Sequence, residues 1–420
     1  MTIEQATPVA LPAARERVRE TGIDFVRALC IIGVVLMHAI MVGVTVGNTG
    51  PVFSNASHGT WWVAPLSWVL MVVPLFFVIG GFSGILFYRR LRATGGTAAG
   101  FIAARIHRLL LPALLVFAVV GSGLALLTLL GVPANLVGVA GLYYSQPLWF
   151  LGVFLLCQAL LPALTTAHER APLRSLAALT TLAAGVDIAR AISGIDSLGF
   201  FNLAFVWLAL QQLGFFFADG TIDRLSRRAR ALIGFGAVAA LALACGSGLY
   251  SPDLIANVNP PTTALLLVGI AHTSGLSLFR AGLETISRRP GAVAITSFVT
   301  PRAMTIYLWH MPVLLAMAGI SAISAMVFGI DLPALSTAAW WLGRPVWLIV
   351  AFVLIAIVAT SVSGLETVRL RTPTPSRAKA AAAVLLGGAS VVIMLISGAT
   401  VITAFAAVAL VLLALQLSNA

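Results

Sequence analysis

Eleven long apolar segments run through this chain, each separated from the next by a short polar segment. A helix needs about 20 apolar residues to cross the hydrocarbon core of a bilayer. The last segment has 38 residues, too many for one span, and Gly398 near its middle suggests two short helices. The segments lie approximately at 23–47, 61–87, 109–131, 147–167, 175–194, 199–218, 231–250, 262–279, 303–328, 338–364 and 380–417. The pattern predicts an all-α, polytopic transmembrane helical bundle of about ten core helices plus one or two C-terminal helices.

Composition excludes a soluble protein. Hydrophobic residues make up 60% of the chain and charged residues 9%, whereas soluble domains carry roughly 25% charged residues. The three cysteines all lie in apolar segments and predict no disulfide framework. No apolar run or cleavage site precedes the first span, so we expect that span to stay in the protein rather than to be removed as a signal peptide.

The net charge of +12 resembles that of a nucleic-acid-binding protein, but the positions of the basic residues indicate membrane topology instead. Of the 25 Lys and Arg residues, 22 fall in alternate polar segments, and the predicted loops between them near 48–60, 132–146, 195–198, 251–261 and 329–337 hold none. Cytoplasmic loops of membrane proteins collect such residues. We therefore expect a multi-pass membrane protein with a cytoplasmic N-terminus and no nucleic-acid partner.

Three basic residues, Arg27, Arg190 and Arg344, fall outside these clusters. Arg344 lies near the outer end of its predicted helix, where a long side chain can extend to the interface. Arg190 follows Asp187 by three residues, a spacing that favours an ion pair on one helix. Arg27 lies just inside the first apolar segment, so it is the most informative of the three.

Ionisable groups inside a bilayer are costly and are functional candidates by default. The intramembrane histidines are His38, His272 and His310. Arg27 and His38 are eleven residues apart, which places them on one helix face about 16 Å apart along the axis, with Asp24 near the same face. The alternatives are a buried histidine bonded to a neighbouring helix and an arginine that extends to the interface.

Three further groups are candidates. Arg105 and Arg108 lie three residues apart at a membrane edge, where two guanidinium groups suit phosphate oxygens; a topology-setting charge cluster is the alternative. Tyr307, Trp309 and His310 lie a few residues into a predicted helix, just before Pro312. Trp149 lies at the outer end of another helix, where aromatic residues are more often interface anchors. No metal-ligand pattern is present.

Taken in order, these motifs resemble the acyltransferase-3 family of bacterial integral membrane acyltransferases. The features are Arg27 with His38 after ten intervening residues; Phe76-Phe77-Val78-Ile79-Gly80-Gly81-Phe82, similar to the family's Phe-Phe-x-x-Ser-Gly-Phe; Arg105-x-x-Arg108 ahead of Pro112; and Tyr307-Leu308-Trp309-His310, similar to Tyr-Leu-x-His. The resemblance covers about residues 20–365. It divides the chain into a cytoplasmic segment 1–22, a membrane domain 23–365, a cytoplasmic linker 366–379 and an extra helix or hairpin 380–417.

The resemblance implies an O-acyltransferase. In such proteins an acyl group, commonly acetyl, moves from a cytoplasmic acyl-CoA to a hydroxyl of an extracytoplasmic carbohydrate, glycolipid or lipid. Carried over, His38 is the catalytic base or transient acyl carrier, and Arg27 is counted with it among the catalytic residues. Arg27, Arg105 and Arg108 then serve the donor's phosphates or the architecture around them. The acyl-CoA is a co-substrate, and no bound cofactor is expected. Asp24, Tyr307, Trp309, His310 and Trp149 become candidates for the substrate pocket.

Two departures limit the carry-over. The family's serine is Gly80 here, and no carboxylate follows Trp149, where some members have a glutamate. A transporter or flippase of a cell-envelope lipid or glycan, with His38 and Arg27 along its path, is the competing hypothesis. A usage of 24 Arg against one Lys indicates a GC-rich bacterial gene, so we expect the bacterial inner or plasma membrane.

Overall fold

The computed structural model of the chain describes residues 20–47, 50–56, 60–365 and 372–420. Within them, eleven helices are long and apolar enough to cross a membrane, or twelve if the bent pair α10 (Ala264–Leu278) and α11 (Arg280–Ser287) counts as one span. The predicted helical membrane bundle is confirmed. The predicted cytoplasmic residues Arg15, Arg17, Arg19, Arg369 and Arg371 lie outside the described residues.

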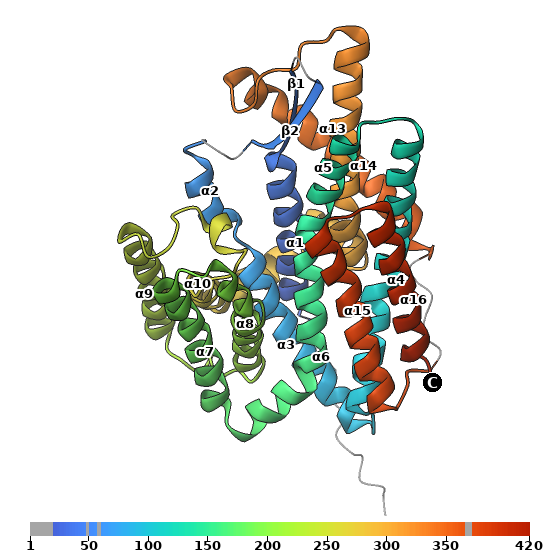
Figure 1. The fold of residues 1–420 in the computed structure, drawn as a ribbon. Coiled ribbons are helices and arrows are strands. Elements are labelled where there is room, and N and C mark those ends of the chain that lie inside the picture. The colour runs from blue at the N-terminus through green and yellow to red at the C-terminus, as the bar shows by residue number, and fades with distance from the viewer. Residues whose placement is uncertain (1–19, 48–49, 57–59, 366–371) are drawn as a thin grey trace, which may run out of the picture.

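Three helices occupy the middle of the molecule in Figure 1: α1 (Thr21–Met41), α3 (Val73–Ala93) and α6 (Trp149–Arg170). On one side of them lie α7 (Pro172–Ser193), α8 (Asn202–Ala218), α9 (Arg227–Gly246) and α10. On the other side lie α4 (Ala98–Leu129), α15 (Arg377–Ser397) and α16 (Val401–Ser418). The helices α12 (Pro290–Val299), α13 (Ala303–Phe328) and α14 (Ala338–Ser363) complete the bundle around α1.

Shorter elements close one end of the bundle, which we call the hairpin end. Strands β1 (Val42–Gly47) and β2 (Gly50–Asn55) pair antiparallel at the top of Figure 1. The predicted apolar segment 23–47 is therefore helical only as far as Met41. With them lie α2 (Val63–Leu70), α5 (Ala134–Ser145) and the 3₁₀ turns η1 (Gln146–Leu148), η2 (Asp196–Phe201) and η3 (Leu254–Asn257).

The glycine of the second motif allows two helix backbones to touch. A Cβ atom added at Gly81 of α3 would lie 2.1 Å from the carbonyl oxygen of Gln211, and one at Gly214 of α8 would lie 2.1 Å from that of Val78. Small residues at such crossings let membrane helices pack closely. This contact fixes α3, which also carries Phe76, against α8.

The C-terminal apolar segment forms two helices that break at Gly398, where φ is +70°. Both pack against α4, and α15 also packs against α6. A Cβ atom at Gly141 of α5 would lie 1.8 Å from the carbonyl oxygen of Ala399, so the turn between the two helices fits only against a glycine. The hairpin prediction for this segment therefore agrees with the structure.

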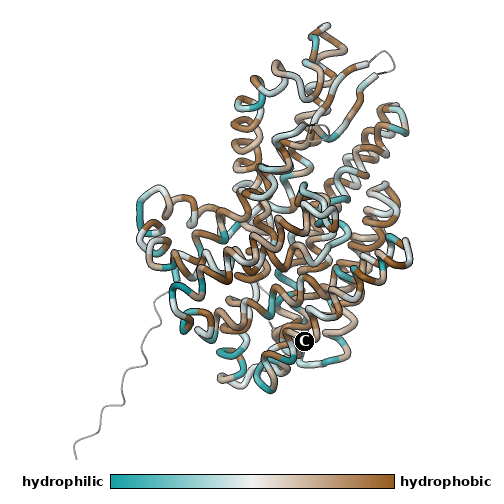
Figure 2. The backbone as a smooth tube through the Cα atoms, turned by 90° about the vertical axis from the view of Figure 1, so that its left-hand side faces the viewer, coloured by the Kyte–Doolittle hydropathy of each residue, from teal (hydrophilic) through white to brown (hydrophobic). Residues whose placement is uncertain are grey.

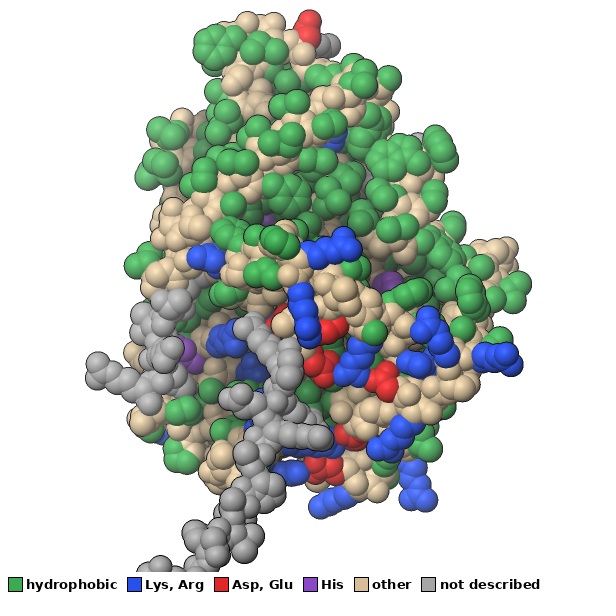
Figure 3. Space-filling model, turned by 180° about the vertical axis from the view of Figure 1, so that it is seen from behind, with side chains coloured by type: hydrophobic (Ala, Val, Ile, Leu, Met, Phe, Trp, Pro, Cys, Tyr) green, Lys and Arg blue, Asp and Glu red, His purple; other side chains and the backbone are tan. Residues whose placement is uncertain are grey.

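Hydrophobic residues dominate the helices, and polar residues gather at their ends (Figure 2). Lys and Arg side chains gather over the lower half of the face in Figure 3, with acidic side chains among them. We call this end, where α1 begins and α3 ends, the arginine-rich end. There Arg89 of α3 donates to Asp219 at 2.5 Å and to Glu169 at 3.1 Å. Although burial opposes ionisation, hydrogen bonds from Arg89 and His168 hold the pKa of Asp219 below its usual range.

The predicted ion pair between Asp187 and Arg190 is wrong. Arg190 Nε contacts Asp196 at 3.2 Å, because the chain turns back after α7 and brings η2 beside it. Asp187 instead accepts hydrogen bonds from the Tyr250 hydroxyl at 2.9 Å and the Thr263 amide at 2.8 Å. Burial raises the pKa of Tyr250 to about 12, so the phenol keeps its proton for this bond.

Candidate active site

A single face of α1 carries the first three candidate residues, as the spacing predicts. Arg27 Nη2 donates to Asp24 Oδ1 at 2.7 Å, near the start of the helix. His38 lies in its last turn. Eleven residues of helix separate the Cα atoms of Arg27 and His38 by about 16 Å along the axis. The charged pair is therefore at the arginine-rich end, and the histidine lies towards the hairpin end.

The backbone of α1 determines which nitrogen of His38 is available for chemistry. The His38 Nδ1 atom lies 2.9 Å from the carbonyl oxygen of Val34. A carbonyl oxygen can only accept a hydrogen bond, so Nδ1 carries the proton in the neutral ring. The lone pair is consequently on Nε2. An imidazole in this tautomer can take a proton from a hydroxyl, or attack a thioester, through that nitrogen.

His310 lies directly against His38. The two ring centroids are 4.9 Å apart and the rings are tilted by 52°. His310 is fully buried in α13, and its Nδ1 donates to the carbonyl of Tyr307. Its Nε2 has no hydrogen-bond partner among the described residues. Two imidazoles this close disfavour a doubly protonated pair.

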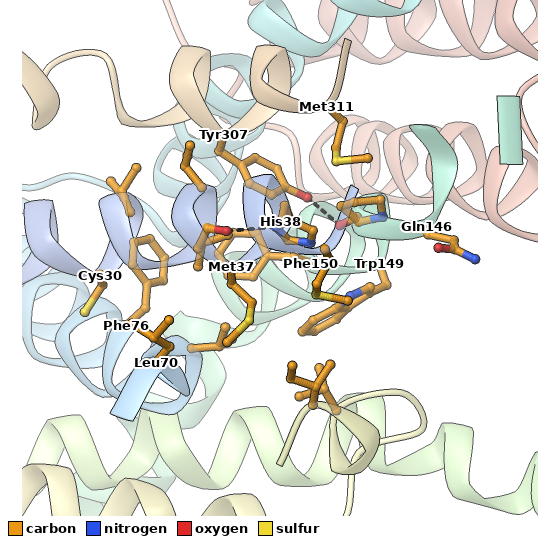
Figure 4. Close-up of a pocket in the computed structure, with 18 of the residues that line it drawn as sticks. Cys30, Met37, His38, Leu70, Phe76, Gln146, Trp149, Phe150, Tyr307 and Met311 are labelled. Atoms are coloured by element: carbon orange, nitrogen blue, oxygen red, sulfur yellow. Dashed lines mark hydrogen bonds between the residues drawn. The ribbon is translucent and has the colours of Figure 1, made fainter. Parts of the chain in front are cut away.

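A pocket of about 360 Å³ extends along α1 beside His38. Its lining starts at Cys30, which lies one helical turn beyond Arg27, and continues through His38 and Met41 to Asn55 and Asn259 at the hairpin end. Figure 4 shows the labelled side chains around His38, with Cys30 and Phe76 on one side of it and Gln146 on the other. The pocket thus runs from a point one helical turn beyond Arg27 to the hairpin end.

Two of the aromatic candidates line this pocket. The Tyr307 hydroxyl donates to the carbonyl of Pro147 at 2.6 Å, which fixes α13 against η1 (Figure 4). Trp149 lines the pocket and stacks on Trp207 at a centroid distance of 5.4 Å. Trp309 is buried, but it is not part of the pocket lining. Its neighbour His310 does not line the pocket either, but it contacts two lining residues, His38 and Tyr307.

The two arginines of α4 differ in their surroundings. Arg105 lies over the rings of Phe87 and Phe101, with its guanidinium carbon 4.6 and 5.3 Å from the two ring centroids. Its charge interacts with those of Arg108 and Arg27, so the three cations are near one another. Arg108 is exposed. None of the three lines the pocket, whose lining starts one helical turn beyond Arg27; a cluster of guanidinium groups is a suitable surface for a phosphorylated ligand.

Arg344 of α14 belongs to the site's supporting structure, although the sequence suggested a side chain that extends to the interface. That interpretation is wrong, because Arg344 is only 7% exposed. Its Nη2 donates to the carbonyls of Ala39 at 2.9 Å and of Val42, directly after His38. Its guanidinium carbon lies 3.9 Å from the Trp340 ring centroid and 4.7 Å from that of Trp347. Arg344 therefore caps the helix end that holds the histidine.

Sequence comparison supplies a family. The sequence model of one family, described as an acyltransferase domain, matches residues 20–364. Searches among curated proteins and among solved structures gave no match. The matched range contains every candidate site residue and ends before α15 and α16.

Proposed function

The chain belongs to the acyltransferase-3 family and is a membrane acyltransferase, and from this premise we propose that it transfers an acetyl group from cytoplasmic acetyl-CoA to a hydroxyl of an extracytoplasmic carbohydrate, glycolipid or lipid. The observation that carries the proposal is the course of the pocket, which begins one turn beyond Arg27, passes His38 and ends at the hairpin end. Family membership favours this enzyme over a transporter or flippase.

Donor binding is assigned to the arginine-rich end. Arg27, Arg105 and Arg108 are close enough for their charges to interact, and a CoA carries several phosphate groups that such a cluster can hold. Asp24 keeps one of the three guanidinium groups paired at 2.7 Å. The thioester arm then follows the pocket along α1 towards His38.

In the transfer step, Nε2 of His38 removes the proton from the acceptor hydroxyl. The hydroxyl oxygen forms a bond to the thioester carbonyl carbon, the carbon–sulfur bond breaks, and CoA leaves as the thiolate. The imidazolium returns its proton to that thiolate, so the enzyme ends unchanged. In the two-step variant Nε2 itself attacks the thioester carbonyl carbon, the carbon–sulfur bond breaks, and CoA leaves as the thiolate. The acyl-imidazolium then passes its acyl group to the acceptor oxygen, the hydroxyl proton goes to the thiolate, and His38 returns to its neutral form.

The acceptor is assigned to the hairpin end. The polar side chains at that end of the pocket include Asn55, Tyr143, Gln146 and Asn259, which can hydrogen-bond a hydroxylated molecule. We propose that this end faces outwards and the arginine-rich end faces the cytoplasm, as the distribution of arginines indicates. The membrane in question is the bacterial inner membrane.

The experiment is acyl transfer by the full-length protein in lipid nanodiscs, with radiolabelled acetyl-CoA and membrane lipid and glycan extracts as acceptors. His38→Ala should lower the rate about 10²- to 10⁴-fold, the contribution typical of a general base. His272→Asn is the control, since His272 lies in α10 outside the pocket. Mass spectrometry of enzyme quenched with donor alone separates the one-step route from an acyl-His38 intermediate.

Two results would contradict the proposal. One is a His38→Ala protein that elutes as a single species on gel filtration and transfers acetyl at the wild-type rate. The other is a wild-type protein that neither binds nor consumes acetyl-CoA.

A further inference from the structure

The walls of the pocket are unusually rich in methionine. Five of the nine methionines in the chain line it, and they come from α1, from the junction of α2 and α3, and from α13: Met37, Met41, Met71, Met304 and Met311. The thioether side chain is unbranched and polarisable, and it adapts its shape to irregular apolar ligands. Phe76, Phe150 and Trp149 also belong to the apolar wall, together with aliphatic side chains such as Ile31 and Leu70.

Charge is missing from this lining. Among the residues that the structure describes, no Lys, Arg, Asp or Glu lines the pocket. A phosphate or carboxylate on the acceptor would lose its hydration there without gaining a counter-ion, which is costly. The guanidinium groups of Arg27, Arg105 and Arg108 lie at the arginine-rich end, outside this lining.

The three amide side chains of the lining lie at its hairpin end, which we call the mouth of the pocket. Gln146 and Asn259 are both exposed, one at the start of η1 and the other just after η3. Asn55 ends β2 beside them in the lining. The pocket is therefore polar at its mouth, apolar along its walls, and carries its reactive nitrogen between the two ends.

We propose that the acceptor is an uncharged amphipathic alcohol, whose alkyl chain lies against the methionine wall while its hydroxylated head group contacts the amides at the mouth. This inference rests on the proposed function and narrows its acceptor to the lipid and glycolipid class. A water-soluble polysaccharide would leave the methionine wall without a partner. The adaptable wall accepts chains of different shape, so the length of the chain matters more than its detailed structure.

A first experiment follows the label. Native membranes containing the protein are incubated with radiolabelled acetyl-CoA, and the products are partitioned between chloroform–methanol and water. The label is expected in the organic phase, in a species that does not bind an anion exchanger. Label in a water-soluble polymer, or in an anionic lipid, overturns the inference while leaving the acyltransferase assignment intact. Failure of the proposed function looks different, because the donor is then not consumed at all.

A second experiment measures the dependence on chain length with purified protein in nanodiscs. The probes are methyl, butyl, hexyl and octyl β-D-glucosides, kept below their micellar concentrations. The kcat/KM for acetylation, or the inhibition constant where a glucoside competes without reacting, should improve roughly fourfold for each methylene buried. A flat series overturns the inference. So does a rate that rises with the acyl chain of the donor instead, since the wall then holds the acyl group.

Matched variants tie the effect to the pocket. Met41→Gln keeps the length of the side chain but makes the wall polar, and it should flatten the chain-length dependence. Met326→Gln is the control, because Met326 is also on an apolar helix but is 49% exposed and outside the pocket. Equal chain-length dependence in the two variants counts against the methionine wall.

Discussion

The two ends of α1 are both capped by charged side chains from distant parts of the chain, but in opposite ways. At the start, Glu284 of α11 accepts from the Gly22 amide and the Thr21 hydroxyl, each at 2.9 Å. At the end, Arg344 of α14 donates to the carbonyls of Ala39 and Val42. An anion at a helix N-terminus and a cation at its C-terminus both complement the helix dipole.

The surroundings of the two caps differ. The Glu284 side chain is 29% exposed and also contacts Arg288 at 3.2 Å, so water and a cation both reach this carboxylate. Arg344 is buried, lies over two tryptophan rings and forms no ion pair with any residue in the described ranges. Burying a charge without a counter-ion costs free energy. Charged residues kept inside a membrane protein commonly mark functional positions, and Arg344 contacts the backbone just after His38. We propose that the start of α1 binds the donor and that its end positions the histidine.

Of the two caps, the buried one should have the larger effect when it is removed. In Arg344→Met the carbonyls after His38 lose their donor, and small displacements of a catalytic group cost up to about 10²-fold in rate. We expect kcat to fall about 10- to 100-fold, with the KM for acetyl-CoA changed less than about twofold. Steady-state kinetics in nanodiscs measure both.

Arg344→Lys is the matched variant. Lysine keeps the positive charge and can donate to carbonyls, but it lacks the planar group that stacks on tryptophan. It should recover part of the lost kcat. A methionine variant with the wild-type kcat would show that the cap only supports the fold.

A substitution at the start of α1 should change the KM for acetyl-CoA rather than kcat. Arg27→Ala removes one charged hydrogen-bond donor to the phosphates, which is worth about 1.5–3 kcal/mol. The KM for acetyl-CoA should rise about 10- to 100-fold while kcat changes little. Arg190→Ala is the control, because its partner Asp196 is 89% exposed and the pair lies away from the pocket. A fall in kcat with an unchanged KM would place Arg27 at the chemistry and remove the distinction between the two ends.

Hydropathy and arginine positions predicted the helices well because both are local properties of the sequence. They failed where local signals compete, at 42–47. There Val42, Val44 and Val46 alternate with small or polar residues, which is a strand pattern, yet the segment continues an apolar run. Strands β1 and β2 pair with each other, so backbone groups of this segment form their hydrogen bonds between strands instead of within a helix.

In the site too, features set by local sequence were predictable and contacts between distant residues were not. The shared face of Arg27 and His38 follows from helix geometry, so it was predictable. The contact between His38 and His310 joins residues far apart in sequence, and spacing alone does not reveal it. Arg344 was missed because its partners are backbone carbonyls and tryptophan rings, which leave no charge pattern. The signal that remained was an arginine flanked by Trp340 and Trp347 at helical spacing.

The smallest effect is expected from Glu284→Gln, which tests whether the exposed cap matters to chemistry at all. Glutamine keeps one acceptor oxygen for the Gly22 amide, and its NH2 group can donate to the oxygen of the Thr21 hydroxyl. The main loss is therefore the interaction of the charge with the helix dipole, about 0.3–1 kcal/mol. The melting temperature should fall by a few degrees at most, with kcat and KM within about twofold of wild type. Arg288→Gln is the control for the exposed ion pair, which contributes at most about 1 kcal/mol. If Glu284→Gln instead lowers kcat as Arg344→Met does, the two caps act on His38 through the helix as a whole. If it changes only the melting temperature, the cap beside the histidine is the one tied to catalysis.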